Sequence, residues 1–531
     1  MLNSEHLKGD IFGGLTAAVV ALPLALAFGV ASGVGPIAGL YGAIAVGFFA
    51  AAFGGTPTNV SGPTGPMVVV FAGLAAAFVD QPALIFTAVV LAGVIQILLG
   101  VLRLGTYIRL VPYPVVSGFM SGIGCIIIIL QASRIVGGEA PPGTVNALMA
   151  IPGALANING MAALLGALSL LIVFFWPPKI AKYLPGPLAA LIIGTLISVQ
   201  FPGAPIIGDI PSGLPDLTLP AAEALFSPVV LQAAIILAVL GAIDSLLTSL
   251  VADNMTRTRH DSNKELLGQG IGNTVAGFIG GIPGAGATMR TVVNIRTGGR
   301  TRVSGMLHSL VLLAIVLALG PLAEQIPHAV LAGILFKVGF DIIDWTYLKR
   351  SHRGPRVDLA LMMLVLLMTV FVDLMTAVFV GVFLAALAFI QQLADAQVKR
   401  LREQDFSMES EEERAALEQA GGRISIMAFT GPMSFAAAAD LGHHVRETVQ
   451  PHQRAVVLDF SDVPFLDVSA ARAVETVAVD AKDAGQDLYV AGLNDAGRGT
   501  LRELGADAAI AEDAFFPTRL DALRRAVAGL A

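Results

Sequence analysis

Long apolar stretches recur along most of this chain, and they limit the folds it can adopt more than any other feature. Between Ile11 and about Gln391, apolar runs of about membrane-spanning length are separated by short turns that contain Pro and Gly or Arg and Lys. A helix needs about 20 apolar residues to cross a bilayer core, and helices pair their own backbone polar groups in lipid. The pattern therefore predicts an all-α polytopic membrane domain.

The apolar segments number about fourteen, and the turns between them give their approximate bounds. We place them at 11–31, 36–53, 64–79, 82–101, 112–132, 160–177, 186–200, 228–252, 264–281, 286–296, 303–320, 328–343, 357–372 and 374–392. Composition agrees with this interpretation, because 55% of the 531 residues are hydrophobic and only 13% are charged. Ordinary soluble domains have about 25% charged residues. The net charge of −7 gives no indication of nucleic-acid binding.

Charged residues are distributed unevenly, and this divides the chain into parts. We predict a transmembrane domain over 1–395, built from two repeats of seven segments over about 11–200 and 228–392. An acidic linker follows over 396–421, and a small soluble α/β domain occupies 422–531. The linker and the last domain have the mixed polar sequence of a soluble protein, so we expect a membrane domain followed by a soluble tail.

Basic residues in the turns orient the segments in the membrane. If the N-terminus is inside, the predicted cytoplasmic loops carry Arg103, Arg109, Lys179, Lys182, Arg257, Arg259, Lys264, Arg296, Arg300, Arg302, Lys349, Arg350, Arg353 and Arg356. The predicted outer loops are nearly free of basic residues, with Arg134 as the exception, and the long outer loop at 201–227 contains Asp209, Asp216 and Glu223. This distribution follows the positive-inside rule. We therefore expect a multi-pass protein of the inner cell membrane with both termini in the cytoplasm.

The third and the tenth segments are too short to cross a bilayer as helices. The apolar runs at 64–78 and 286–295 fall short of the required length of about 20 residues, and Pro/Gly-rich stretches at 54–66 and 280–286 precede them. Short, interrupted segments at matching positions of two halves indicate a transporter binding site. A helix that begins in mid-membrane presents unpaired N–H groups and a positive dipole end, which favour an anion. The alternative is a pair of re-entrant stretches that serve packing alone.

Asp244 is the only ionisable residue in the eighth segment, at 229–251. A carboxylate at this depth is costly and indicates a functional site. Thr248 follows four residues later, so both side chains lie on one face of the helix. With backbone carbonyls near the tenth segment they would form an oxygen cage for a hard cation such as sodium. A bound proton is the open alternative, as is a structural role for a protonated or helix-bound Asp244.

The start of the tenth segment offers groups that suit an anion. Gly286 and Ala287 are small, so a ligand can approach their backbone closely, and Thr288 adds a hydroxyl group. Arg290 either reaches the anion or braces the helix against backbone carbonyls. The matching residues at the start of the third segment are Thr64 and Gly65.

Several stretches of the chain, including those at the starts of the third and tenth segments, resemble the sulfate permease (SulP) family, also known as solute carrier family 26. The resemblance rests on 9–10, 13–19, 21–23, 56–57, 61–67 and 288–299, and it extends over essentially the whole chain. It implies a UraA-like fold with a seven-plus-seven inverted repeat, a core domain that moves against a gate domain, and a homodimer. It also implies a sodium site at Asp244, Thr248, Gly286 and Ala287, and bicarbonate bound near Thr64, Ala287 and Thr288.

At two positions, those of Asp244 and Met289, the type of residue varies among members of this family. Many relatives that carry sulfate or dicarboxylates have Glu in place of Asp244, so the aspartate favours the bicarbonate branch. Other relatives place Ser before the arginine that matches Arg290, whereas this chain has Met289. This difference makes a sulfate or chloride carrier less well supported, and it leaves the role of Arg290 open.

The tail resembles the STAS domain, a module shared with anti-anti-sigma factors. Apolar residues at 423–427 and 455–460 predict strands that alternate with helices, and 465–471 resembles the STAS loop. Ser469 occupies the position at which those regulators are phosphorylated, so it is a candidate regulatory phosphosite. Ala470 replaces the usual Gly, and the alternative role for Ser469 is to cap the helix that follows.

Three functions remain open at this point. The leading prediction is secondary active, sodium-coupled transport of bicarbonate; the others are proton-coupled transport of sulfate or a dicarboxylate, and a membrane-tethered STAS signalling protein. An enzyme is least expected, because no nucleophile–base constellation or metal-ligand spacing is present. Apart from sodium as the coupling ion we expect no cofactor. The expected partners are a small inorganic anion, the lipid bilayer, a second copy of the chain and a cytoplasmic regulator of the tail.

Overall fold

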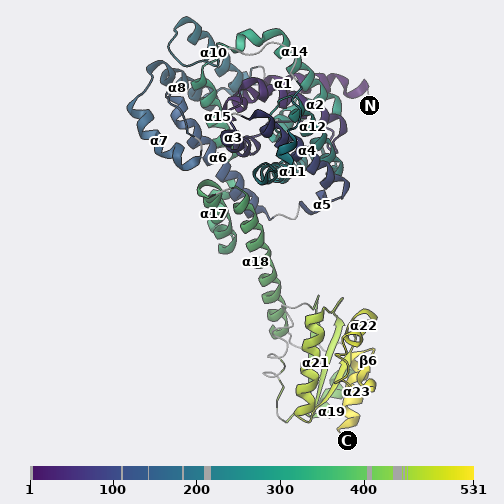
Figure 1. The fold of residues 1–531 in the computed structure, drawn as a ribbon. Coiled ribbons are helices and arrows are strands. Elements are labelled where there is room, and N and C mark those ends of the chain that lie inside the picture. Colours follow the sequence, from purple (N-terminus) through teal and green to yellow (C-terminus); the bar gives the residue numbers. More distant parts are fainter. Residues whose placement is uncertain are drawn as a thin grey trace. The chain divides into compact units, whose positions relative to one another are not determined.

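The computed structural model describes residues 4–79, 81–108, 112–141, 143–181, 184–208, 217–372, 374–403, 410–433, 445, 449–450 and 452–530. Their contacts divide the chain into two compact units, Met1–Phe383 and Leu384–Ala531, which are described separately (Figure 1). The loop residues Arg109, Lys182, Asp209 and Asp216 lie outside the described residues, as does the part of the predicted linker at 404–409.

The first half of the membrane unit is helical. Its helices are α1 (Ser4–Ala31), α2 (Pro36–Phe53), α3 (Gly65–Ala77), α4 (Pro82–Val101), α5 (Gly105–Ile108), α6 (Tyr113–Ile135), α7 (Thr144–Ala156), α8 (Gly160–Phe175), α9 (Pro178–Ala181) and α10 (Gly186–Gln200). Proline begins several of them, for example Pro36 in α2 and Pro82 in α4. The first helical position needs no N–H donor and suits the fixed φ of proline.

The second half repeats this pattern. Its elements are η1 (Ala222–Phe226), α11 (Pro228–Thr256), α12 (Ser262–Phe278), α13 (Thr288–Arg296), α14 (Arg302–Ala323), α15 (His328–Ile342), α16 (Trp345–Arg350), η2 (Ser351–Arg353), α17 (Arg356–Phe371) and α18 (Leu374–Glu403). A helix lies within or across each of the predicted apolar segments. Helix α7 was not predicted, because Pro141, Pro142 and Pro152 made the region between the fifth and sixth segments resemble a loop.

Length and composition identify five described helices that could each cross a membrane, namely α1, α2, α4, α6 and α11. Helices α7 and α8, which meet at a bend of 118°, would add a sixth span if they counted as one. Several other apolar helices, such as α3 and α10, are shorter. The chain is therefore a multi-pass membrane protein, and the count of fourteen segments stays a prediction.

Two very short strands join the two halves. Strand β1 (Ser61–Gly62) pairs antiparallel with β2 (Ala285–Gly286), with Ser61 opposite Gly286 and Gly62 opposite Ala285. Strand β1 lies within the first Pro/Gly-rich stretch and β2 lies at the end of the second, and helices α3 and α13 begin within a few residues of them. The pairing therefore brings the two short segments together at their N-termini, as the inverted repeat predicts.

The helices of the membrane unit pack in two groups. In one group α12 packs against α2 and α4, α14 packs against α1 and α2, and α11 packs against α3, α4 and α13. In the other group α15 and α17 pack against α6, and α15 and α10 pack against α8. Figure 1 shows the two groups side by side, with α6, α7 and α8 in one and α2, α4 and α12 in the other. We call the group that contains α12 the core group and the group that contains α6 the gate group, after the core and gate domains that the family resemblance implies.

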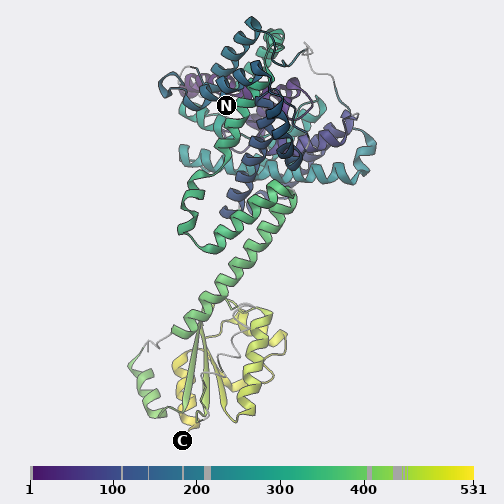
Figure 2. The same ribbon diagram turned by 90° about the vertical axis from the view of Figure 1, so that its left-hand side faces the viewer.

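The tail is an α/β unit with one parallel sheet. The strands follow the order β3 (Ile424–Thr430), β4 (Ala455–Asp462), β5 (Asp487–Ala491) and β6 (Phe515–Phe516), and all neighbours are parallel. The helical elements are α19 (Glu411–Ala420), α21 (Val468–Asp483), α22 (Asp495–Glu503), η3 (Glu512–Ala514) and α23 (Arg519–Gly529). Helices α21 and α23 cover opposite faces of the sheet (Figures 1 and 2). Strand β4 is buried from Ala455 to Phe460 because it lies inside the sheet.

The structure corrects the proposed capping role of Ser469. Helix α21 begins at Val468, and the side chain of Asp467 accepts a hydrogen bond of 2.8 Å from the N–H of Ala470. Asp467 is therefore the N-cap residue, and Ser469 is an exposed residue of the first turn. An exposed position is compatible with the candidate phosphosite, which stays a prediction.

A buried ion network holds helix α19 and helix α23 to the sheet. Arg519 lies 2.9 Å from a carboxylate oxygen of Glu413 and 3.3 Å from one of Asp459. The side chains of all three residues are at most 14% exposed. Removing one partner of a buried ion pair leaves uncompensated charge and costs about 3–5 kcal/mol.

We expect Arg519→Leu to destabilise the tail by this amount, because two buried carboxylates lose their cation. The full-length protein is heated, and the temperature at which a protease begins to cleave within 422–531 measures the effect. Arg524→Leu is the matched control, since Arg524 pairs with Glu412 on the surface at 2.6 Å. Exposed pairs contribute about 0–1 kcal/mol, so equal effects of the two substitutions would contradict the prediction.

Candidate functional site

The predicted cation ligand and the predicted anion ligands meet where α11 passes the starts of α3 and α13. Asp244 is buried in α11, and its carboxylate faces the hydroxyl group of Thr64 and the guanidinium group of Arg290. Thr64 is the N-cap residue of α3. Neither Asp244 Oδ2 nor Thr64 Oγ1 completes a hydrogen bond with a described residue. Buried oxygens of this kind are suited to a ligand.

Three oxygens form a cluster around Thr248, one helical turn after Asp244 in α11. Thr248 Oγ1 donates to the carbonyl of Gly286 at 2.9 Å and lies 2.7 Å from Thr288 Oγ1. The N–H of Gly286 donates to Ser245 Oγ at 3.0 Å, which fixes the strand against α11. Thr248 thus lies on the side of α11 that faces the tenth segment, as its spacing from Asp244 predicts. We call Thr248 Oγ1, Gly286 O and Thr288 Oγ1 the oxygen cluster.

Both backbone groups of Ala287, the N–H and the carbonyl, form hydrogen bonds. Its N–H donates to the carbonyl of Val60 at 3.0 Å, and its carbonyl accepts from the N–H of Thr291 at 2.9 Å. A carbonyl oxygen has a second lone pair, so Gly286 and Ala287 remain candidate cation ligands. The N–H of Ala287 cannot bind an anion without losing its present acceptor. The first-turn amides of α13, which begin at Thr288, have no partner within the helix, and they are the amides that a ligand at this helix start would meet.

The sequence left two roles open for Arg290, binding the anion or bracing the helix against backbone carbonyls. In the structure its side chain braces the helix. The side chain is 2% exposed, and Nη2 donates to the carbonyl of Pro63, the residue before Thr64. Arg290 therefore ties the start of α13 to the start of α3, in addition to its attraction to Asp244. The neighbouring Met289 is 60% exposed, so its side chain takes no part in this contact. Direct binding of the anion by Arg290 stays a prediction.

Gly65 lies where the two helix groups meet. A methyl group at this position would come within 2.7 Å of Ile127 Cδ1 in α6 and 2.9 Å of Ile342 Cδ1 in α15. Helices α6 and α15 belong to the gate group, whereas α3 packs on α11 in the core group. The predicted anion ligands at the start of α3 are therefore at the boundary between the groups.

Sequence reasoning missed the polar network that holds the first Pro/Gly-rich stretch in place. Glu265 of α12 is almost fully buried, and its two carboxylate oxygens accept four hydrogen bonds of 2.7–2.9 Å. The donors are Gly55 N, Thr56 N, Asn59 Nδ2 and Gln269 Nε2. Further along α12, Asn273 forms two hydrogen bonds with the backbone of Gly284. Helix α12 thus fixes the stretches that lead into both short helices.

A signal for this network was present in the sequence. Glu265, Gln269 and Asn273 follow each other at intervals of four residues within an apolar segment. Residues spaced by four lie on one face of a helix, so a polar stripe there indicates buried partners. The partners themselves, such as Asn59, are about 200 residues away in the chain, and no local pattern identifies them.

We expect Glu265→Gln to lower both thermal stability and transport. A glutamine has one acceptor oxygen, so two of the four buried donors would face an NH₂ group. Each buried donor left unpaired costs about 1–3 kcal/mol. The melting temperature in detergent and uptake in proteoliposomes measure the two effects. Glu223→Gln in η1 is the control, since Glu223 is exposed; the network would have no positioning role if both variants behaved like the wild type.

Comparison with known protein families matches both parts of the chain. The sulfate permease family matches residues 7–365, and the STAS domain matches residues 416–522. Among curated proteins, the bicarbonate transporter BicA of a Picosynechococcus strain is 43% identical over 551 aligned positions, which cover 100% of this chain and 96% of the relative. The match includes the tail as well as the membrane unit.

Solved structures share the fold. The transmembrane domain of a cyanobacterium bicarbonate transporter BicA is 50% identical, with a TM-score of 0.67, and covers 71% of this chain and 98% of its own. The murine Solute Carrier 26 family member A9, an anion transporter in the inward-facing state, covers 99% of this chain and 92% of its own. Its TM-score is 0.83 at 19% identity, which extends the likeness in fold to nearly the whole chain.

Proposed function

This chain belongs to the sulfate permease family of anion transporters, and from this premise we propose that it is a sodium-dependent bicarbonate symporter. The observation that carries the proposal is the position of Asp244, a buried carboxylate between the starts of two short helices. The similarity to a bicarbonate transporter over the full chain supports the choice of anion. The cluster of oxygens around Thr248, one helical turn after Asp244, supports sodium as the coupling ion.

The proposed coupling is electrostatic. A fixed carboxylate would repel an anion bound at Thr64, because two unit charges 4 Å apart interact by about 4 kcal/mol at an effective dielectric constant of about 20. A sodium ion held by Asp244, Thr248 and the backbone carbonyls of Gly286 and Ala287 cancels this repulsion. The anion then binds well only when sodium is present. Each ion thereby raises the affinity for the other by the same factor, as linkage requires.

The short helices supply the attraction for the anion. The first turn of a helix has unpaired N–H groups and about half a positive charge, and β1 and β2 hold two such ends together. Thr64 and Thr288 add hydroxyl groups at these ends. Bicarbonate, which is planar and accepts hydrogen bonds through all three oxygens, fits a site with donors on two sides.

Movement between the helix groups completes the proposed cycle. The site lies at the boundary where Gly65 faces α6 and α15, so a displacement of the core group against the gate group changes which side the site faces. We propose that this displacement requires both ions or neither. We also propose a homodimer in the inner cell membrane with cytoplasmic termini, and a STAS tail that binds a cytoplasmic regulator.

Uptake of radiolabelled bicarbonate into proteoliposomes, measured against external sodium, tests the proposal. We expect uptake to rise with sodium and to be competed by unlabelled bicarbonate more strongly than by sulfate or fumarate. Uptake of sulfate driven by a proton gradient without sodium would contradict the proposal. Removal of 400–531 separates a carrier from a sensor, because a carrier retains flux without its tail.

A further inference from the structure

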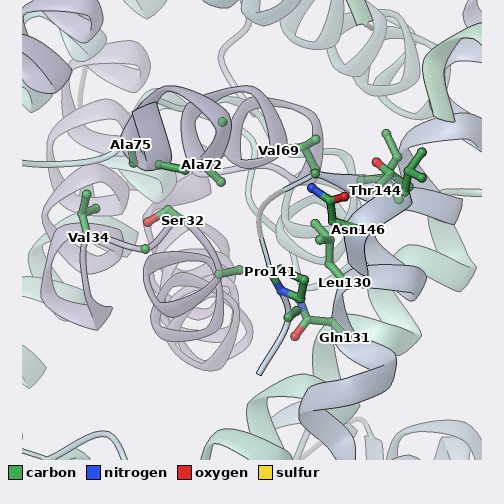
Figure 3. A pocket seen from close by; sticks show the side chains of 18 of the residues that line it. Ser32, Val34, Val69, Ala72, Ala75, Leu130, Gln131, Pro141, Thr144 and Asn146 are labelled. Atoms are coloured by element: carbon green, nitrogen blue, oxygen red, sulfur yellow. The ribbon is translucent and has the colours of Figure 1, made fainter. Parts of the chain in front are cut away.

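The predicted outer side of the membrane unit is hollowed between several helix ends. A cavity of about 810 Å³ opens between the ends of α1, α3, α6 and α17 and the beginnings of α4 and α7 (Figure 3). On the topology given above, each of these helix ends faces the outside. In α3 the lining reaches Val69, five residues from Thr64, or about 7.5 Å along a helix. The cavity thus lies next to the central site but does not include it.

Arg134 gives this cavity its charge. Among the described lining residues it is the one charged side chain, and it is also the exception to the near absence of basic residues in the predicted outer loops. Arg134 is half-buried in the last turn of α6 and forms no hydrogen bond or ion pair with the described part of the chain. The charged or titratable groups that face it are Glu139, which is exposed, and His328 at the start of α15.

Two further features of the cavity suit an anion. Gln131, one turn before Arg134, is 3% exposed, and its side-chain amide lines the cavity without a partner among the described residues (Figure 3). The first turn of α7 lines the same cavity, with Gly143 as an N-cap that provides no side-chain hydrogen bond. The amides of Thr144 and Val145, at the start of this 13-residue helix, therefore have no intrahelical partner and carry partial positive charge.

We propose that Arg134, Gln131 and the N-terminus of α7 form an outer binding site for a small inorganic anion. This inference rests on the proposed function, since the anion that gathers there is the one that the central site then takes up. A positive charge within a low-dielectric cavity raises the local concentration of anions and the rate at which they enter. The site determines how well external anion is captured and leaves the later movement unchanged.

The expected signature is a change in KM without a change in kcat. Arg134→Gln raises the KM for external anion by about 3- to 10-fold, at the low end of electrostatic steering effects, and the difference shrinks as inert salt is added. Arg134→Lys keeps the charge and a KM near that of the wild type. An Arg134→Gln variant with an unchanged KM, or a lowered kcat alone, would overturn the proposal.

The single cysteine of the chain, Cys125, permits a sharper test in intact cells. In a Cys125→Ser background, Arg134→Cys is treated from outside with a membrane-impermeant methanethiosulfonate that carries a trimethylammonium group. The restored positive charge lowers the KM again, whereas the sulfonate reagent raises it further. Lys179→Cys, in the predicted cytoplasmic loop, is the control that external reagent does not affect. The outer site is wrong if the two reagents act alike on the Arg134→Cys variant.

The two proposals fail in distinguishable ways. If the wild type shows no sodium-dependent uptake of bicarbonate, the proposed function is wrong, and the Arg134 comparison is made with the anion that the wild type does carry, sulfate first. If the wild type takes up bicarbonate as proposed and the charge at position 134 leaves the KM unchanged, only the outer site is wrong.

Discussion

Asp244→Asn is expected to abolish the stimulation of bicarbonate uptake by sodium while the protein remains folded. The substitution keeps the size of a side chain that is buried in α11 and removes the only negative charge proposed for the cation site. Losing an interaction of about 4 kcal/mol corresponds to a loss of sodium affinity of about 700-fold, at about 1.4 kcal/mol for each factor of ten. Initial rates of uptake into proteoliposomes, measured over a wide range of sodium concentrations, give the change in affinity.

Two further variants make this result specific. Asp244→Glu retains the charge, so it is expected to keep some stimulation by sodium with altered affinity. Asp341→Asn removes a carboxylate whose ion pair with Lys337 is partly exposed, and it is expected to leave uptake unchanged. Sodium stimulation that survives in Asp244→Asn would show that the cation binds elsewhere, and the coupling scheme would then have to be abandoned.

Gly284→Ala is expected to remove most transport and to lower the melting temperature. A methyl group at Gly284 would lie 2.5 Å from the carbonyl carbon and 2.6 Å from the oxygen of Gly62. Because these are backbone atoms, the two short strands would have to separate, and the starts of α3 and α13 would move apart with them. Overpacking of this kind costs about 1–3 kcal/mol or more. Uptake assays and thermal unfolding in detergent measure the two effects.

Gly73→Ala provides the matched control on helix α3 itself. A methyl group there meets nothing within 4 Å, and alanine favours a helix interior over glycine by up to about 1 kcal/mol. We expect normal uptake and equal or higher stability. The proposed dependence of the site on the strand pair would be refuted by a Gly284→Ala variant that transports as well as Gly73→Ala.

The part of the site that the sequence could predict depends on local physics. Short apolar runs after Pro/Gly-rich stretches predicted the two half-helices, since length and breakers act locally, and a lone carboxylate in an apolar segment predicted Asp244. The spacing of Thr248 from Asp244 predicted their common face. The contact of Thr248 with Gly286 at 2.9 Å confirms that this face looks toward the tenth segment.

Other features depend on partners that are distant in the chain. The four donors around Glu265 come mainly from residues about 200 positions away, and the acceptor for Ala287 is Val60. Helix α7 was missed because prolines and glycines locally favour a loop, whereas packing against α6 and α17 favours the helix. The capping of α21 by Asp467 instead of Ser469 reflects a shift of two residues in a helix start, which local propensity does not resolve.

The two-residue pairing of β1 with β2 has a consequence for how such a carrier can change its cargo. The strands hold the starts of α3 and α13 together through main-chain groups, which every amino acid other than proline supplies. Thr64 Oγ1 completes no hydrogen bond with a described residue, and the side chain of Met289 is exposed, so neither side chain contributes to the strand pairing. Under the proposed function, substitutions at these two positions would change the choice of anion without disrupting the strand pair. A selection for growth on a different anion would be expected to recover variants there before it recovers variants at Gly62 or Gly284.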